Sequence, residues 1–331
     1  MKKTILTGDR PTGKLHIGHL IGSLQNRVKL QDEYNEYILM ANIQAFTDNF
    51  LNPQKVRDSI PELIKDYYAV GIDFDKAHVI MQSEIPEIHE IFIYLSNFAT
   101  IQQIAHNPTV KTEIIQKKYG ESTPLGFYMY PIHQIADIAC VRGNLIPVGP
   151  DQVPIVEDCR EVMRKFNRTY NTDVLVEPEA LVGISKNVPG IDGNEKMGKS
   201  LNNAIYLSDT EEELKKKVMS MKTDPNRIHA TDPGQVEGNT VFTYHDIFNT
   251  DKDEVADLKE RYTKGTVGDV EVKQKLFTAM HEMLLPIRER RLEAEKIEKD
   301  LFASVIESSN NARKIAREVA DQMKDAMMMK F

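Results

Sequence analysis

Short apolar runs alternate along the first two thirds of the chain with longer segments in which apolar residues recur every three or four positions. The short runs have the length of buried strands, and the longer segments have the period of amphipathic helices. Strands are predicted at residues 4–7, 37–41, 78–81 and 144–148. Because strands that alternate with helices pair in parallel, we predict an α/β fold with a doubly wound, Rossmann-like sheet.

The clearest predicted helix begins after Asn52. Asparagine is a good N-cap, and Pro53 suits the first turn, where its missing N–H is not needed. The apolar residues that follow recur at three and four positions, as expected for one buried helix face. They are Val56, Ile60, Leu63, Ile64, Tyr67 and Tyr68.

The pattern changes after Ser200, where charged amphipathic helices dominate and residues 240–244 form an isolated strand signal. Pro286 is expected to kink or break one of these helices, because proline removes an intrahelical hydrogen bond. The predicted helices are residues 211–221, 254–264, 270–295 and 312–328. We therefore predict two domains, an α/β domain over residues 1–205 and a mostly α-helical domain over residues 206–331.

Composition indicates an ordinary globular protein. The 331 residues are 41% hydrophobic and 28% charged, which allows a sizeable core and about two domains. No apolar run resembles a signal peptide or a membrane span, so we expect no membrane partner. Cys140 and Cys159 lack metal-type spacing and fit a cytoplasmic location. The net charge of -8 argues against nonspecific nucleic-acid binding, although a local basic patch at residues 215–217 would suffice for an RNA partner.

The first chemical motif follows the first predicted strand, where residues 8–19 read GDRPTGKLHIGH. This stretch begins like a P-loop, but Leu15 stands where the magnesium-binding hydroxyl is required, so the P-loop interpretation fails. His16 and His19 stand at a predicted helix start, where unpaired N–H groups and the helix dipole attract phosphate. Gly18 leaves room for an adenine against the backbone. Two histidines on an exposed first helical turn are the alternative interpretation.

The second chemical motif is Lys-Met-Gly-Lys-Ser at residues 196–200, after a stretch rich in glycine and proline. Pro189, Gly190 and Gly193 argue against regular structure. Lys196 and Lys199 in a loop of this kind can move onto a polyphosphate and neutralise charge as pyrophosphate leaves. The alternative is an ordinary solvated basic loop.

Together the two motifs resemble the HIGH and KMSKS signatures of class I aminoacyl-tRNA synthetases. The length, the spacing and the segment PVGPDQ at residues 147–152 resemble the tryptophanyl/tyrosyl subgroup, most closely the bacterial tryptophanyl-tRNA synthetases. The resemblance covers nearly the whole chain, and Gly198 departs from the usual serine. It implies a ligase that activates L-tryptophan with ATP and transfers it to tRNA(Trp). It also implies a homodimer and a helical domain that binds the tRNA anticodon.

The resemblance implies a role for each matched residue. The catalytic residues, which contact the phosphates, are implied to be His16, His19, Lys196 and Lys199. Mg²⁺ is expected to bind with ATP, through the phosphates rather than through dedicated carboxylates. The ATP site is implied to be lined by Arg10, Pro11, Thr12, Gly18, His19, Gly149, Pro150, Asp151, Val188, Lys196, Met197, Gly198, Lys199 and Ser200.

Amino-acid recognition is assigned to the middle of the chain. Pro131 suits a helix start, and Tyr130, Gln134 and Asp137 share one face if residues 130–137 are helical. Asp137 lies among apolar neighbours, so its carboxylate needs a partner, and an indole N–H supplies a donor. A helix-surface aspartate is the alternative. The resemblance implies that Asp137 accepts the indole N–H and that Tyr130 and Gln152 hold the ammonium group.

Two residues depart from the tryptophanyl pattern at this predicted amino-acid site. Gln134 replaces the methionine and Gln44 the histidine of many bacterial tryptophanyl enzymes. Tyrosyl-tRNA synthetases use the pattern Tyr-x3-Gln-x2-Asp for tyrosine, so tyrosine is the alternative substrate. Two less favoured alternatives are a His-x-Gly-His nucleotidyltransferase and a non-catalytic, synthetase-like RNA-binding protein.

Overall fold

The computed structural model describes residues 2–117, 119, 123–183, 188–195 and 197–330. Within these residues, five parallel strands form one sheet in the order β3-β2-β1-β4-β5. The strands are β1 (Thr4–Asp9), β2 (Asn35–Met40), β3 (His78–Met81), β4 (Leu145–Val148) and β5 (Glu179–Val182). The chain adds β2 and β3 on one side of β1 and then β4 and β5 on the other. This order confirms the predicted doubly wound fold and places its switch point between β1 and β4.

The strand prediction was correct at four positions and missed β5. Glu179 and Val182 at its two ends are exposed, so β5 lacks the continuous apolar run that marked the other strands. In β2, by contrast, successive side chains enter opposite hydrophobic clusters, Ile38 on one face and Leu39 on the other. The sheet is therefore covered on both faces, as parallel sheets generally are.

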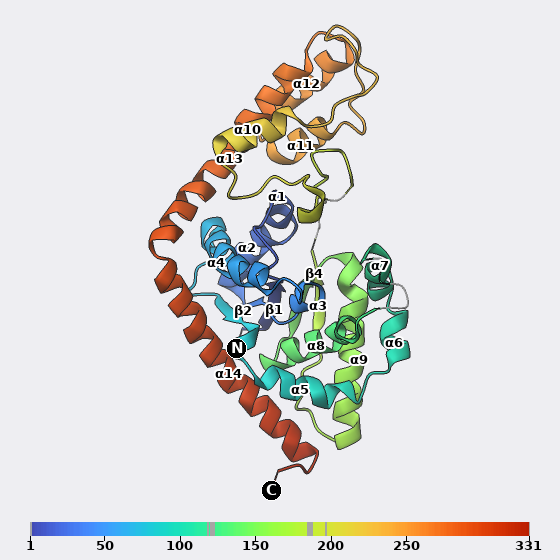
Figure 1. Ribbon diagram of the computed structural model, residues 1–331, viewed down its shortest axis with the longest axis vertical. Helices are drawn as coiled ribbons and strands as arrows, with labels where there is room; N and C mark the ends of the chain where they lie inside the picture. Colours follow the sequence, from blue (N-terminus) through green and yellow to red (C-terminus); the bar gives the residue numbers. More distant parts are fainter. Residues whose placement is uncertain (1, 118, 120–122, 184–187, 196, 331) are drawn as a thin grey trace.

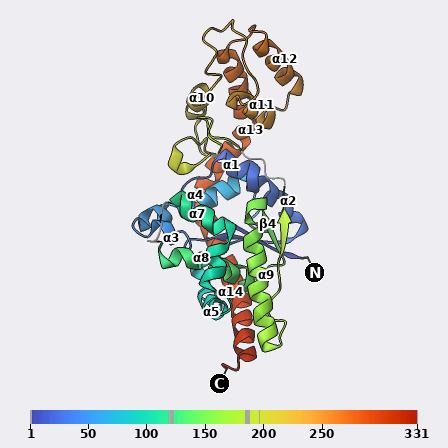
Figure 2. The same ribbon diagram turned by 90° about the vertical axis from the view of Figure 1, so that its right-hand side faces the viewer.

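Helices flank the sheet and then extend beyond it, as Figure 1 and Figure 2 show. Among the described residues, none of them is long and apolar enough to cross a membrane. The helices of the first part are α1 (Ile17–His19), α2 (Gln25–Glu33), α3 (Phe46–Asn49), α4 (Pro53–Val70), α5 (Glu87–Ser96), α6 (Ile101–His106), α7 (Pro108–Lys117), α8 (Leu125–Cys140) and α9 (Val153–Tyr170). Those of the second part are α10 (Glu211–Met219), α11 (Thr240–Phe248), α12 (Lys252–Thr263), α13 (Asp269–Lys296) and α14 (Glu298–Ala326).

Helix α4 begins as its sequence predicts. The Asn52 side chain accepts a hydrogen bond from the Lys55 N–H at 3.3 Å, and Pro53 occupies the first turn. Gly71 ends the helix with a φ of 105°, in the left-handed region that favours glycine. Val56 and Leu63 are among the buried residues of the helix, so the predicted apolar face packs in the core.

Residues 240–244, predicted as a strand, lie in helix α11, so that prediction was wrong. The Asn239 side chain accepts a hydrogen bond from the Val241 N–H at 3.0 Å and starts the helix. The buried residues Val241, Tyr244 and Phe248 then follow at spacings of three and four. The β-branched and aromatic composition favoured a strand, but the cap and the longer periodicity determine the helix.

Two prolines lie inside helices where the sequence predicted a boundary. Helix α8 begins at Leu125, so Pro131 is an interior residue rather than a helix start. Helix α13 continues past Pro286 without a break. Each proline removes one intrahelical hydrogen bond, and the burial of neighbouring side chains, such as Leu284 and Ile287 beside Pro286, stabilises the helix in spite of it.

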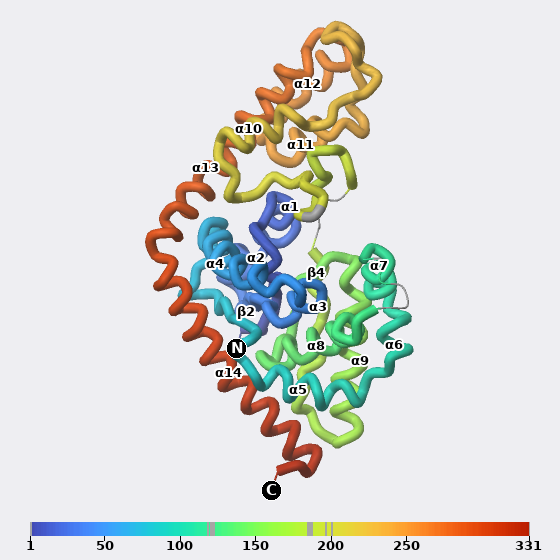
Figure 3. Tube along the Cα trace, viewed as in Figure 1, coloured from blue at the N-terminus to red at the C-terminus, as the bar shows by residue number. Residues whose placement is uncertain are grey.

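The last two helices connect the far end of the molecule to the sheet. Helix α13 packs against α10 and α11 and then against α4. Helix α14, which begins earlier than the predicted residue 312, returns along the sheet and packs against β3, α5 and α8. Figure 3 traces this path from the upper helices to the C-terminus. The C-terminal helices are therefore part of the packing around the sheet.

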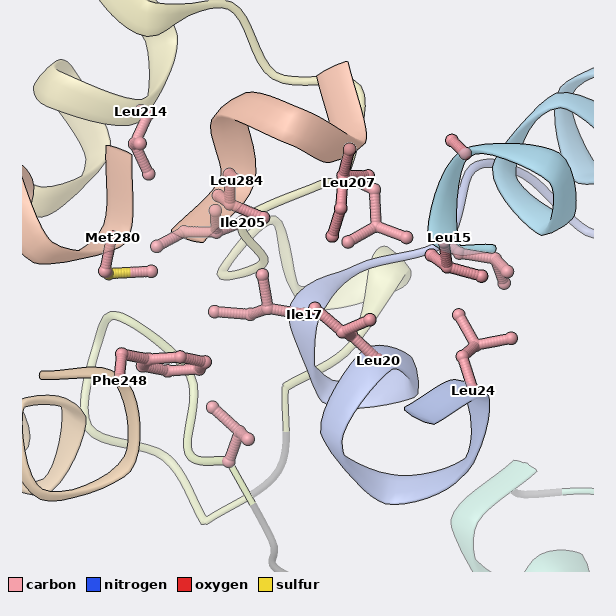
Figure 4. Packing of buried hydrophobic residues seen from close by; sticks show 14 of the residues in the cluster. Leu15, Ile17, Leu20, Leu24, Ile205, Leu207, Leu214, Phe248, Met280 and Leu284 are labelled. Carbon is pink, nitrogen blue, oxygen red and sulfur yellow. The ribbon is translucent and has the colours of Figure 1, made fainter. Parts of the chain in front are cut away.

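One hydrophobic cluster joins the first helical segment to the later helices. Figure 4 shows Leu15, Ile17, Leu20 and Leu24 projecting from that segment into the cluster. Their partners come from distant parts of the chain, namely Ile205, Leu207, Leu214, Phe248, Met280 and Leu284. This packing fixes the position of the turn that carries the two predicted histidines.

Candidate active site

The turn after β1 carries His16 and His19 at the start of a continuous helical stretch. Helix α1 runs directly into a π-helical segment (Leu20–Leu24) and then into α2. The His16 N–H donates to His19 Nδ1 at 3.2 Å, and the His16 carbonyl accepts from the His19 N–H at 2.8 Å. The two ring centroids are 3.8 Å apart. The structure therefore places both imidazoles together at the predicted helix entrance.

Both imidazoles are neutral at pH 7. Burial, together with the nearby positive charge of Lys199, lowers the pKa of His16 to about 3 and that of His19 to about 4. Because His19 Nδ1 accepts a hydrogen bond, the proton of its neutral ring is on Nε2. His19 therefore offers a neutral N–H donor, which can bind a phosphate oxygen without carrying a charge.

The lysine loop reaches the same turn. The Ile17 N–H donates to the Ile205 carbonyl at 3.0 Å, so the segment after the loop is bonded to the histidine turn. Lys199 Nζ donates to the Gly13 carbonyl at 2.7 Å. Gly13 has a φ of 125°, which favours glycine at this bend. The structure thus brings the first motif and Lys199 together, while Lys196 lies outside the described residues.

The structure requires glycine at position 18 but not at position 198. A Cβ atom at Gly18 would lie 2.8 Å from His16 Nδ1, so glycine is needed for the imidazole to pack there. Met197 lies on the same side, with its sulfur 3.8 Å from that position. Gly198 has extended backbone angles, and its N–H donates to Asn203 Oδ1 at 2.9 Å. Serine, the usual residue of the family at this position, would therefore fit the backbone.

Asp9, Arg27 and Tyr67 form a buried polar cluster that the sequence did not predict. Arg27 Nη1 and the Tyr67 hydroxyl donate to Asp9 Oδ2 at 2.6 and 2.7 Å. Burial by itself raises the pKa of Asp9, but the charge and hydrogen bond of Arg27 lower it to about 2. A fixed negative charge therefore lies beside His19 and Lys199. These three residues come from β1, α2 and α4, so no local spacing relates them.

A cavity of about 1530 Å³ lies at the carboxyl ends of the strands, where doubly wound folds bind ligands. Its lining includes the predicted site residues Arg10, Gln44, Tyr130, Gln134, Asp137, Gly149 and Gln152.

The other predicted residues in the described part of the chain do not line this cavity. Pro11 and Thr12 follow Arg10 on the loop that leads to Gly13, whereas the Val188 side chain is buried in the core. Pro150 and Asp151 belong to a short 3-10 helix after β4 (Pro150–Gln152), and Ser200 belongs to another (Lys199–Leu201).

Helix α8 contributes Tyr130, Gln134 and Asp137 to the cavity lining. Asp137 is 3% exposed and Tyr130 is 7% exposed, so neither is an ordinary surface residue. Burial, followed by the charge of Glu113, raises the pKa of the Tyr130 hydroxyl well above its usual range. Gln82 Nε2 donates to the two carboxylate oxygens of Asp137 at 2.8 and 3.0 Å. This is the partner that a buried carboxylate requires, and the sequence pattern gave no sign of it.

Across the residues that the structure describes, no three His, Cys, Asp or Glu side chains are grouped closely enough to hold a metal ion.

Arg10, which lines the cavity, pairs with Asp48 at 3.3 Å, and Lys117 of α7 pairs with the same carboxylate. The cavity is therefore lined by a cation, Arg10, as well as by the Asp137 carboxylate.

The family profile described as "tRNA synthetases class I (W and Y)" matches residues 2–285. Two curated relatives named "Tryptophan--tRNA ligase" cover the whole chain. The one from Streptococcus pneumoniae serotype 4 is 48% identical and aligned over 99% of its own length. The one from Clostridium longisporum is 47% identical and aligned over 98% of its length.

Solved structures show the same architecture. A tryptophanyl-tRNA synthetase from Campylobacter jejuni, complexed with ADP and tryptophan, is 28% identical with a TM-score of 0.86, and the alignment covers 98% of this chain and 99% of that one. A tyrosyl-tRNA synthetase from Archaeoglobus fulgidus, complexed with L-tyrosine, is 19% identical with a TM-score of 0.66, covering 88% and 90%. The second likeness concerns the fold alone.

Proposed function

We propose that this chain, which belongs to the class I tRNA synthetases of the tryptophan and tyrosine group, is a ligase that charges tRNA(Trp) with L-tryptophan. The observation that carries the proposal is the contact of Lys199 with the turn that carries His16 and His19, beside Asp9 of a cavity that Asp137 also lines. Tryptophan is favoured over tyrosine because the relatives at 47–48% identity over the full chain are tryptophan–tRNA ligases.

The reaction has two steps, neither of which needs a protein nucleophile. The tryptophan carboxylate attacks the α-phosphorus of ATP, which forms tryptophanyl-adenylate and releases pyrophosphate. A ribose hydroxyl of the terminal tRNA adenosine then attacks the acyl carbon and releases AMP. Catalysis therefore depends on positioning and on stabilising the phosphate charge.

The phosphate end of the site uses residues of both motifs. His16 and His19 act as neutral donors, and Lys199, with Lys196 from outside the described residues, neutralises charge on the leaving pyrophosphate. Mg²⁺ arrives with ATP and is held through the phosphates. The remaining residues proposed to contact ATP are Arg10, Pro11, Thr12, Gly18, Gly149, Pro150, Asp151, Val188, Met197, Gly198 and Ser200.

The amino-acid end holds tryptophan through α8 and the turn after β4. Asp137 accepts the indole N–H, and Tyr130 and Gln152 hold the ammonium group. Gln134 and Gln44 line the same cavity and contact the bound amino acid. A buried carboxylate that already receives one donor suits a ligand that contributes only an N–H.

We infer the roles of the two domains and the oligomeric state from the family. Residues 1–205 form the catalytic domain, residues 206–331 bind the anticodon, and the protein acts as a cytoplasmic homodimer. Exposed apolar side chains on the part of the chain from α3 to α8 support a subunit interface. They include Phe50, Leu51, Ile101, Ile115 and Leu125.

Amino-acid-dependent ATP–pyrophosphate exchange, measured with tryptophan and tyrosine in parallel, tests the function. We expect exchange with tryptophan and at most a trace with tyrosine. Because the chain contains no tryptophan residue, the fluorescence of bound tryptophan can be followed without background from protein tryptophan. Exchange with tyrosine alone would reassign the substrate, and exchange with neither amino acid would contradict the proposal.

A further inference from the structure

Gln82 lies just after β3, in a short 3-10 helix (Gln82–Glu84), and its side chain is fully buried. Its amide oxygen accepts hydrogen bonds from the N–H groups of Ile43 and Gln44 at 3.1 and 3.0 Å. Its amide nitrogen lies 2.8 and 3.0 Å from the Asp137 oxygens and 3.0 Å from His133 Nδ1. Every donor and acceptor of the amide is therefore used.

The contacts allow only one orientation of the amide. Rotating the group by 180° would direct its NH₂ at two backbone N–H donors, so the oxygen must face Ile43 and Gln44. The NH₂ group then donates one proton toward Asp137 and the other to His133 Nδ1. His133 therefore accepts at Nδ1 and carries its proton on Nε2, which lies 3.2 Å from His89 Nδ1.

This arrangement leaves the Asp137 carboxylate free to accept a hydrogen bond on the side that lines the cavity. The neighbouring His133 nitrogen has no proton to give to the carboxylate, and the donor that Asp137 receives comes from an uncharged amide. The carboxylate is 3% exposed and lines the cavity, so its unused lone pairs face the ligand. The same amide also holds the Ile43–Gln44 turn, and Gln44 lines the cavity on another side.

We propose that Gln82 is a positioning residue of the amino-acid site, which fixes the Asp137 carboxylate in the orientation that receives the substrate N–H. The inference rests on the proposed function, because it takes Asp137 as the acceptor of the indole. Gln82 joins the ends of β2 and β3 to α8, so it aligns groups that come from three separate elements. It does not line the cavity and acts only through Asp137 and the Gln44 turn.

The variant Gln82→Glu tests the contribution of the side-chain NH₂ donor of Gln82 separately from that of its amide oxygen. It keeps an oxygen to accept from Ile43 and Gln44, but it replaces the NH₂ group that faces Asp137. We expect the KM for tryptophan to rise about tenfold or more at pH 8, while the KM for ATP stays within about twofold. The defect should shrink as the pH is lowered toward 6, because a protonated carboxyl group can donate to Asp137 as the amide does.

Gln31→Glu is the matched control. Gln31 is also a buried glutamine that uses both ends of its amide, donating to the Gly71 carbonyl and accepting from the Asp73 N–H. It lies away from the cavity lining, so its substitution should lower stability without changing the KM for tryptophan. Gln82→Met, which has neither donor nor acceptor, should raise that KM by an amount that does not depend on pH.

The outcomes separate the inference from the proposed function. An active wild type together with a Gln82→Glu variant whose KM for tryptophan is unchanged at every pH would overturn the inference. If that variant fails to fold, Gln82→Asn replaces it, since its shorter side chain cannot reach Asp137, and an unchanged KM there would overturn the inference equally. A wild type without tryptophan-dependent exchange would overturn the proposed function on which the inference rests.

Discussion

The ammonium group of Lys199 is partly buried beside two neutral imidazoles, and its desolvation lowers its pKa to about 8, although Asp9 and Asp66 oppose the shift. A bound triphosphate favours the charged form and raises that pKa. ATP binding at pH 8 to 9 should therefore take up a proton, and the KM for ATP should rise as the pH increases above 8. Calorimetric titration with ATP, in buffers of different ionisation enthalpy, measures the uptake.

The variant Lys199→Arg is the control for this proton uptake. Arginine keeps its charge throughout this range, so the proton uptake should disappear and the KM for ATP should lose its rise above pH 8. Exchange activity should fall, because the guanidinium group differs in shape from the ammonium. Equal proton uptake in the wild type and the variant would show that another group titrates.

At the residue scale, the sequence predicted the groups that belong to local motifs. His16, His19 and Lys199 could be identified because short spacings and a family resemblance mark them. Gln82, which holds Asp137, could not be predicted, because its role arises from packing between the ends of different strands and helices. The pKa values of the two histidines also depend on burial, which a sequence motif does not reveal.

At the scale of elements, α14 completes the sheet edge at β3. Ser309 Oγ accepts from the Met81 N–H at 2.9 Å and donates to the Val305 carbonyl at 2.7 Å. Since β3 is an edge strand, the Met81 N–H has no strand partner on that side. Ser309→Ala should leave this buried donor unsatisfied and lower the free energy of unfolding by about 1–3 kcal/mol.

The neighbouring half-buried Ser308 supplies the control for that substitution. Ser308→Ala should change the free energy of unfolding, measured by urea titration, by less than about 0.5 kcal/mol. Met81 immediately precedes Gln82, so Ser309→Ala should also raise the KM for tryptophan modestly. Equal stabilities of the two variants would show that the serine hydroxyl on the β3 edge contributes nothing.

Helices and strands were predicted correctly where local sequence features determine their structure. Helix α4 carries its cap and its first-turn proline in sequence, and both act as predicted. Residues 240–244 were wrongly predicted because their β-branched and aromatic composition favours a strand, whereas the Asn239 cap and the helical periodicity determine α11. Pro131 was wrongly predicted as a helix start because the burial of neighbouring side chains stabilises α8 on both sides of it. Strand β5 is short and exposed at both ends, so its pairing with β4 rather than its composition makes it a strand.

At the scale of the whole molecule, the hydrophobic cluster of Figure 4 crosses the predicted domain boundary. Leu15 and Ile17 of the first motif pack with Leu214 and Phe248 of the helical region. Helical periodicity predicted that α13 and α14 would bury one face, but it cannot say against which surface. The return of α14 to the sheet therefore required the structure.

One buried ion pair connects α13 to the histidine turn. Arg291 of α13 donates to the Asp66 carboxylate of α4, and Asp66 Oδ2 accepts from the Leu15 N–H at 2.9 Å. Asp66 is fully buried, and burial raises its pKa to about 6 even though Arg291 opposes the shift. A displacement of α13 can therefore be transmitted to Leu15, which precedes His16, through the Arg291–Asp66 and Asp66–Leu15 contacts.

Arg291→Met tests whether this connection links the C-terminal helices to ATP binding. Removing the cation leaves the Asp66 carboxylate buried and unpaired, so the free energy of unfolding should fall by about 3–5 kcal/mol, and the KM for ATP should rise severalfold as the His16 turn loosens. Arg290→Met, which changes an exposed neighbour on the same helix, should change neither the free energy of unfolding nor the KM for ATP. Adding Asp66→Asn should restore part of the stability, because the buried charge is then gone, but not the KM for ATP. If the double variant recovered both stability and KM, the pair would be a stabilising contact without influence on the site.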